Sequence, residues 1–102
     1  MADHQDERDL FAQRFAENLV KARRLVGLSQ ERLGLLAGLH RTEIGKLEYG
    51  ERIPRIDSIV KLASVLEVSV DQLIGGVTWE APKRAGERGR FVSNPPAETG
   101  TV

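Results

Sequence analysis

The chain has 102 residues, a formal net charge of zero and no cysteine. This length allows one domain, and the lack of cysteine excludes disulfides and thiolate metal sites. The start, MADHQDERDL, has no apolar run and is not a secretory signal, and no apolar run reaches the ~20 residues that cross a bilayer. We therefore expect a soluble, cytoplasmic protein.

Charge is distributed unevenly along the chain. Residues 1–9 carry a net charge of −3, residues 10–75 carry +2, and residues 76–102 carry +1. A foldable region this mildly basic does not by itself indicate a nucleic-acid partner. The positions of the charged side chains must therefore decide whether DNA is a plausible partner.

The hydrophobic pattern predicts five short helices and no strand in the core. Residues 1–8 are expected to form a disordered arm before the first helix, which begins near the capping residue Asp9 and stops before Gly27. The helices are expected at about Asp9–Val26, Gln30–Ala37, Arg41–Tyr49, Ile56–Leu66 and Val70–Ile74. Loops this short force neighbouring helices to pack together, so we expect a compact all-α domain over residues 9–75.

Residues 76–102 are rich in proline, glycine and charge and are interpreted as a flexible C-terminal tail. Trp79 and Phe91 are exceptions to that composition. Two interpretations stay open: an unstructured tail with a stray aromatic residue, or a tail that docks through Trp79 and Phe91 on the domain or on a second copy. The basic residues of the tail are either a DNA-contacting arm or part of a solvated linker.

The segment from residue 30 to residue 49 has the features of a helix-turn-helix. Two helices joined by a tight turn cross steeply only where their backbones approach closely, and Gly34 supplies the small residue that this requires. Gly38 suits a left-handed turn position, and Ile44 and Leu47 are spaced to pack the second helix on the first. The joint spacing of these four residues predicts a helix-turn-helix motif.

The outward face of the second helix of this motif carries groups that match DNA base edges. At 100° per residue, with the apolar residues turned inward, this face begins with Arg41, Thr42 and Glu43 and continues to Lys46. Arginine pairs with guanine, threonine contacts a thymine methyl group, and glutamate accepts a hydrogen bond from cytosine. Gly45 lowers helix propensity but removes bulk where the helix would approach the major groove. The alternative is an ordinary solvated helix face.

The run LSQERLGLLAGLHRTEIGKLEYGERIPRIDSIVKLASVLEVSVDQLI, from Leu28 to Ile74, resembles the Cro and phage-repressor type of helix-turn-helix domain, also called the xenobiotic-response-element (XRE) family. The matching residues are Leu28, Ser29, Gln30, Leu33, Gly38, Ile44, Leu47, Glu48, Gly50, Pro54 and the closing run LASVLEVSVDQL. The resemblance implies the compact five-helix repressor fold. It also implies a transcriptional regulator that binds operator DNA, usually as a dimer.

The resemblance implies roles for individual residues. The implied DNA contacts are Arg41, Thr42 and Lys46 at bases, with Glu43 as a further candidate, and Gln30, His40 and Arg52 at phosphates. Arg23 and Glu48 match a buried structural ion pair between the first and third helices. His40 departs from the family pattern because a serine or threonine usually caps this helix, so it is either a weaker cap or a phosphate contact. Tyr49 stays undecided between a backbone contact and packing at the helix end.

We expect a sequence-specific DNA-binding transcriptional regulator that acts as a homodimer on an inverted repeat, because two copies double the few contacts of one domain. The alternative is an antitoxin or protein-interaction adaptor that binds a partner through the tail. An enzyme is not expected, because the chain offers no Ser/His/Asp set and no phosphate-binding loop. With two histidines and no cysteine, we expect neither a metal site nor a cofactor.

Overall fold

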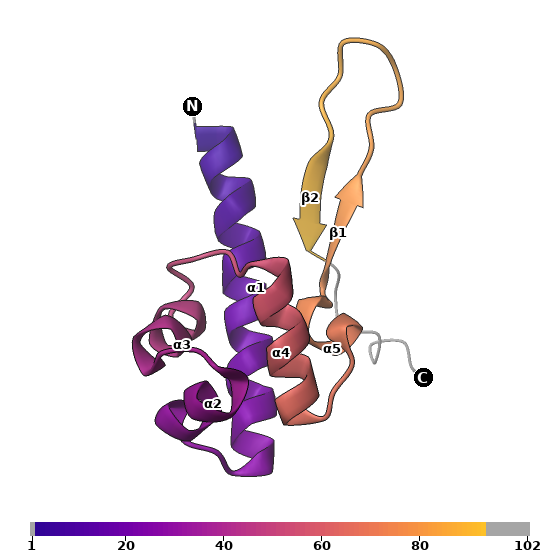
Figure 1. The fold of residues 1–102 in the computed structure, drawn as a ribbon. Helices are drawn as coiled ribbons and strands as arrows, with labels where there is room; N and C mark the ends of the chain where they lie inside the picture. Colours follow the sequence, from indigo (N-terminus) through magenta and orange to yellow (C-terminus); the bar gives the residue numbers. More distant parts are fainter. Residues whose placement is uncertain (1, 94–102) are drawn as a thin grey trace.

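The computed structural model describes the backbone of residues 2–93 and the side chains of residues 8–93. In chain order, the elements are α1 (Ala2–Val26), α2 (Gln30–Ala37), α3 (Arg41–Glu48), α4 (Ile56–Leu66), α5 (Val70–Ile74), β1 (Val77–Glu80) and β2 (Arg90–Ser93). Figure 1 shows α1 as the long central helix, with α2 and α3 on one side and α4, α5 and the two strands towards the other.

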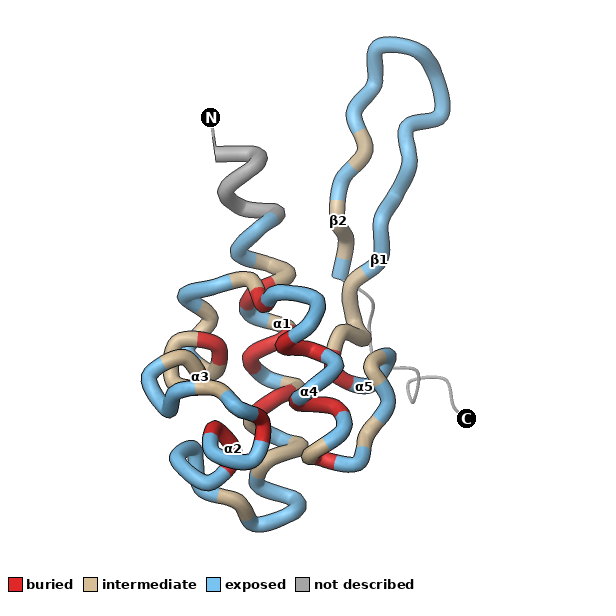
Figure 2. The backbone as a smooth tube through the Cα atoms, viewed as in Figure 1, coloured by how far each residue is buried: buried red, intermediate tan, exposed pale blue. Residues whose placement is uncertain are grey.

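All five helices contribute to a single apolar core. The largest fully buried side chains are Phe15, Leu19, Leu33, Ile44, Leu47, Leu62, Leu66 and Leu73. Figure 2 shows these buried stretches where the helices face one another, whereas the connecting loops are largely exposed. The predicted all-α class is therefore confirmed for the helical domain. None of the described helices is both long and apolar enough to span a membrane.

The first helix begins earlier than the sequence analysis predicts. It starts at Ala2 instead of Asp9, so most of the expected disordered arm is helical. Residues 2–8 contain neither glycine nor proline, so no residue in this stretch terminates the helix. Asp9 is a suitable capping residue, but this preference is outweighed by continuation of the helix.

Part of the expected C-terminal tail is a β-hairpin. Strands β1 and β2 pair antiparallel, with Trp79 opposite Phe91. The two rings pack edge to face, with centroids 5.1 Å apart, and Phe91 also packs on Phe11 of α1 at 5.6 Å. The expected docking of the tail on the domain is therefore present through Phe91, whereas Trp79 remains 54% exposed.

Arg14 of α1 fixes the base of the hairpin to the helical domain. Its guanidinium donates to the carbonyl oxygen of Gly76 at 3.0 Å and to the hydroxyl of Ser93 at 2.9 Å. These bonds connect one helix to both ends of the hairpin. Because an isolated two-stranded hairpin is only marginally stable in water, packing and hydrogen bonding to α1 account for its presence.

Candidate nucleic-acid interface

The turn between α2 and α3 depends on two glycines. Gly38 ends α2 with φ 73° and donates its N–H to the carbonyl oxygens of Gly34 and Leu35. At Gly34, a Cβ atom would lie 2.5 Å from the carbonyl oxygen of Leu39 and 3.4 Å from Cγ1 of Ile44. Only glycine fits this close approach without moving the backbone. The two positions together allow the tight turn and the close approach of α2 and α3.

A nearly buried ion pair holds α3 on α1. The Arg23 guanidinium donates to both carboxylate oxygens of Glu48, at 2.5 and 3.0 Å, and to the carbonyl oxygen of Leu28 at 2.8 Å. The two side chains are 13% and 6% exposed. The hydrogen bond to Glu48 raises the pKa of Arg23, and its effect exceeds the opposing effect of burial. Arg23 therefore stays charged, and the orientation of α3 is fixed by two parallel bonds.

Gln30 joins the same network from the start of α2. Its Nε2 donates to Glu48 Oε1 at 2.8 Å, although the Gln30 side chain remains at the surface. Glu48 thus accepts bonds from both α1 and α2 while belonging to α3. The residue expected to contact a phosphate is therefore held at a fixed place beside α3.

An open hollow of about 460 Å³ lies on the outward side of the helix-turn-helix. It is lined by Gln30, Arg41, Thr42, Gly45, Lys46, Tyr49 and Glu51. The structure therefore brings Arg41, Thr42 and Lys46 together with Gln30 around one concave surface. A Cβ atom at Gly45 would meet no atom within 4 Å, so this position forms an open part of the surface.

Two further residues line this hollow. Helical spacing predicts Tyr49, one turn beyond Gly45, on the outward face of α3, and its side chain is 79% exposed there. Glu51 lies in the loop after α3, whose path no periodic pattern indicates.

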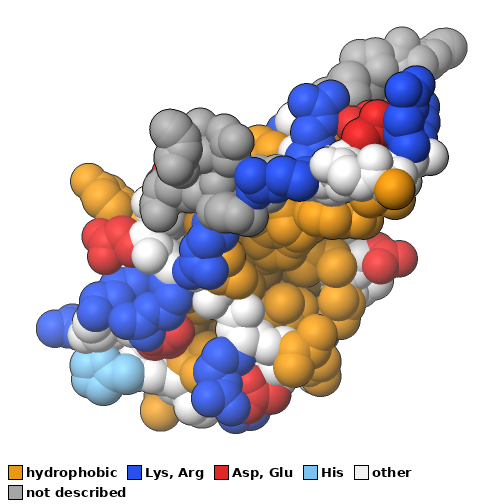
Figure 3. Space-filling model, turned by 90° about the horizontal axis from the view of Figure 1, so that it is seen from above, with side chains coloured by type: hydrophobic (Ala, Val, Ile, Leu, Met, Phe, Trp, Pro, Cys, Tyr) orange, Lys and Arg blue, Asp and Glu red, His pale blue; other side chains and the backbone are white. Residues whose placement is uncertain are grey.

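Lysine and arginine side chains gather on one side of the molecule. Figure 3 shows them in blue beside a pale blue histidine, with acidic side chains in red next to them. The hairpin extends on the opposite side of α1 and α4 from α3 (Figure 1). The basic residues Arg41 and Lys46 share the hollow with one acidic residue, Glu51, although the chain as a whole has zero net charge.

His40 caps α3 through its side chain. With φ −70° and ψ 147°, its backbone has the extended conformation of a capping residue, and Nδ1 accepts the Thr42 N–H at 3.0 Å. An accepting Nδ1 places the ring proton on Nε2. Of the two roles considered for His40, the cap is thus present in the structure.

Replacing His40 with alanine is expected to lower the free energy of unfolding by about 1 kcal/mol, because one N–H at the start of α3 loses its acceptor. Chemical denaturation of the purified variant measures this change. His40→Ser is the control and should retain wild-type stability, because serine caps well. Equal stability of His40→Ala and wild type would show that the cap contributes nothing.

Glu43 and Arg52 lie together at the edge of this surface. Arg52 Nη1 and Glu43 Oε1 are 2.5 Å apart, with the two side chains 47% and 24% exposed. Glu43 does not line the hollow that contains the other three base-reading candidates. The structure thus pairs a predicted base reader with a predicted phosphate contact.

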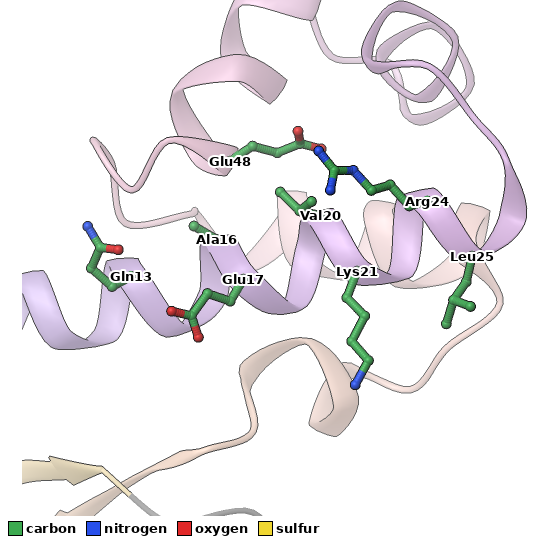
Figure 4. Close-up of a pocket in the computed structure, with 8 residues that line it drawn as sticks. All are labelled: Gln13, Ala16, Glu17, Val20, Lys21, Arg24, Leu25 and Glu48. Atoms are coloured by element: carbon green, nitrogen blue, oxygen red, sulfur yellow. The ribbon is translucent and has the colours of Figure 1, made fainter.

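A larger open hollow, of about 600 Å³, runs along the outer face of α1. Figure 4 shows its lining: long polar side chains from α1, including Gln13, Glu17, Lys21 and Arg24, with Glu48 at one side. It holds none of the predicted DNA contacts. Within the part of the chain that the structure describes, no cluster of three metal-ligating side chains is found.

Comparison with known proteins identifies the family. Residues 19–73, just over half of the chain, match the helix-turn-helix family model HTH_3. The chain is 42% identical over 59 residues to control protein C.SmaI of Serratia marcescens. The matched segment covers 58% of this chain and 70% of C.SmaI. It is 34% identical over 59 residues to the transcriptional repressor RstR of a cryptic phage in Vibrio cholerae, but spans only 53% of RstR.

A solved structure shows the same arrangement of helices. The restriction-modification controller protein C.AhdI from Aeromonas hydrophila matches with a TM-score of 0.59 and 37% identity, over 61% of this chain and 94% of C.AhdI. The chain therefore belongs to the XRE-type helix-turn-helix family HTH_3 and is a DNA-binding transcription regulator, not an enzyme.

Proposed function

We propose that this regulator inserts the N-terminal half of α3 into the major groove of operator DNA, as a homodimer on an inverted repeat. The observation that supports the proposal is the placement of Arg41, Thr42 and Lys46 around one open hollow at the surface of the helix-turn-helix. The close crossing at Gly34 and the Arg23–Glu48 pair hold this helix rigidly. Rigid placement matters because base edges are read by side chains at defined positions.

Base contacts and backbone contacts are divided between different residues in this proposal. Arg41, Thr42 and Lys46 read bases, whereas Gln30, His40 and Arg52 hold the phosphates. Gln30 uses one amide N–H on Glu48 and has a second for a phosphate oxygen. His40 caps α3 through Nδ1 and can donate to a phosphate through Nε2–H. The two alternatives considered for His40 are therefore compatible.

A dimer follows from the small size of the reading surface. One α3 with three base-reading side chains covers few base pairs, and a two-fold related copy doubles both base and phosphate contacts. Dimers of helix-turn-helix domains place their reading helices about 34 Å apart, one turn of DNA, so the operator is an inverted repeat. Binding should weaken steeply with salt because phosphate contacts release condensed counterions.

In vitro selection of bound DNA tests this proposal, followed by Arg41→Ala and Lys46→Ala on the selected site. Each variant is expected to lose about 1–3 kcal/mol of binding free energy and to relax the preference at one base position. Lys61→Ala, on the exposed side of α4, is the matched control and should retain that preference. A uniform loss over all sequences would make the residue a phosphate contact, and no enriched inverted repeat would contradict the proposal.

A second candidate function is a protein-interaction role, as an antitoxin or adaptor that binds a partner through the hairpin. It is favoured by Trp79, which is 54% exposed on a hairpin directed away from α3. Truncation after Gly76 separates the two roles. Unchanged DNA binding and dimerisation after the cut would leave the hairpin for another protein, whereas loss of dimerisation would assign it to the homodimer.

A further inference from the structure

We propose that Glu43 is a positioning residue for Arg52 and not a reader of bases. This inference rests on the proposed function, because it concerns how the same surface holds operator DNA. In this inference, the Glu43 carboxylate contacts Arg52 within the protein, and the Arg52 guanidinium contacts a phosphate of the DNA backbone.

The geometry of the pair supports this assignment. Glu43 lies in the first turn of α3, whereas Arg52 lies in the loop that follows the last turn of the same helix. Their ion pair, at 2.5 Å, therefore ties the loop back to the start of α3. Glu43 is the more covered partner, 24% exposed against 47%, and it lies outside the hollow formed by the base-reading candidates.

The chemistry of the guanidinium allows both contacts at once. Arginine has five N–H donors in a planar fork, and the bond to Glu43 uses one of them, at Nη1. The remaining donors of a half-exposed guanidinium can bind a phosphate oxygen while the carboxylate keeps its place. The second carboxylate oxygen of Glu43, Oε2, remains an acceptor, but the side chain lies outside the hollow that holds the base-reading candidates.

A carboxylate that makes no contribution to binding and one that orders Arg52 predict opposite changes in DNA affinity when Glu43 is removed. A lone carboxylate near DNA is repulsive, so its removal should tighten binding, but by less than about twofold at physiological salt, where charges are screened over about 8 Å. A carboxylate that orders Arg52 is favourable instead. Its removal leaves a long side chain to be ordered on binding, which weakens affinity about two- to tenfold.

The experiment compares Glu43→Ala with Glu31→Ala on the selected operator, over a range of salt concentrations. Glu31 is the matched control, because it carries the same charge in the first turn of α2, as Glu43 does in the first turn of α3, and it lines no part of the hollow. We expect Glu43→Ala to bind about two- to tenfold more weakly, with unchanged base preferences, and Glu31→Ala to bind as tightly as wild type or slightly more tightly.

Arg52→Ala completes a double-mutant cycle. It should reduce the slope of log affinity against log salt by about one phosphate contact. The double variant Glu43→Ala/Arg52→Ala should bind like Arg52→Ala alone, because Glu43 has no arginine left to position. Melting temperatures check that each variant folds. Glu43→Gln keeps the side-chain shape, so it should weaken binding less than Glu43→Ala does.

Three results would overturn the inference while leaving DNA binding in place. They are a changed preference at one operator position, tighter binding by Glu43→Ala, and a loss that persists in the Arg52→Ala background. A wild-type chain that shows no salt-dependent DNA binding would instead overturn the proposed function itself, and this inference with it.

Discussion

Replacing Glu48 with alanine is expected to lower the free energy of unfolding by about 3–4 kcal/mol. The substitution leaves the Arg23 guanidinium, 13% exposed, without the carboxylate that accepts two of its hydrogen bonds. It also removes the acceptor for Gln30. Chemical denaturation monitored by far-ultraviolet circular dichroism measures the change, which is large for a domain of this size.

The double substitution Arg23→Met/Glu48→Leu is the control for this prediction. It removes both charges and replaces them with apolar groups of similar volume. The double variant should therefore regain most of the free energy of unfolding that Glu48→Ala loses. DNA affinity should not recover fully, because Gln30 is then no longer held beside α3. A single Glu48→Ala variant as stable as wild type would contradict a structural role for the pair.

Replacing Gly34 with alanine is expected to destabilise the fold by about 2 kcal/mol, although alanine favours helices by about 1 kcal/mol. The added Cβ would lie 2.5 Å from the carbonyl oxygen of Leu39, and this oxygen belongs to the backbone of the turn. The turn must therefore move, which also disturbs the bond from the Leu39 N–H to the Gly34 carbonyl oxygen, now 2.8 Å long. Thermal and chemical unfolding measure the loss.

Gly45→Ala provides the matched control, because it makes the same chemical change one helix later. Apart from the backbone of its own helix, no atom lies within 4 Å of the added methyl group, so this variant should gain about 1 kcal/mol of stability. The methyl group would project into the hollow between Arg41 and Lys46, so operator affinity should fall even as stability rises. Equal stability effects at the two glycines would contradict the close crossing of α2 and α3.

The helical domain could be predicted because its periodic apolar residues mark the core directly. Phe15, Leu19, Ile44 and Leu47 recur at helical spacing, and all are buried. The turn at Gly38 follows from the conformational freedom of glycine and has the expected positive φ. The Arg23–Glu48 pair, however, followed from family resemblance, because two charges 25 residues apart carry no local signal.

The hairpin could not be predicted, because what stabilises it is distant in sequence. Each strand has four residues, and the bond from Arg14 to Ser93 joins positions 79 residues apart. The composition between the strands is typical of a linker, so local propensity favoured a tail. The Glu43–Arg52 pair is similar in kind: it depends on the path of the loop after α3, so each charge was interpreted separately.

The central claim is that the N-terminal half of α3 enters the major groove, and backbone-amide NMR during titration with the selected operator tests it most directly. We predict chemical-shift changes at Gln30, at residues 40–46 and at Arg52, with Lys21 and Leu25 on the outer face of α1 unchanged. Shift changes concentrated on the outer face of α1, with residues 40–46 unaffected, would contradict the claim.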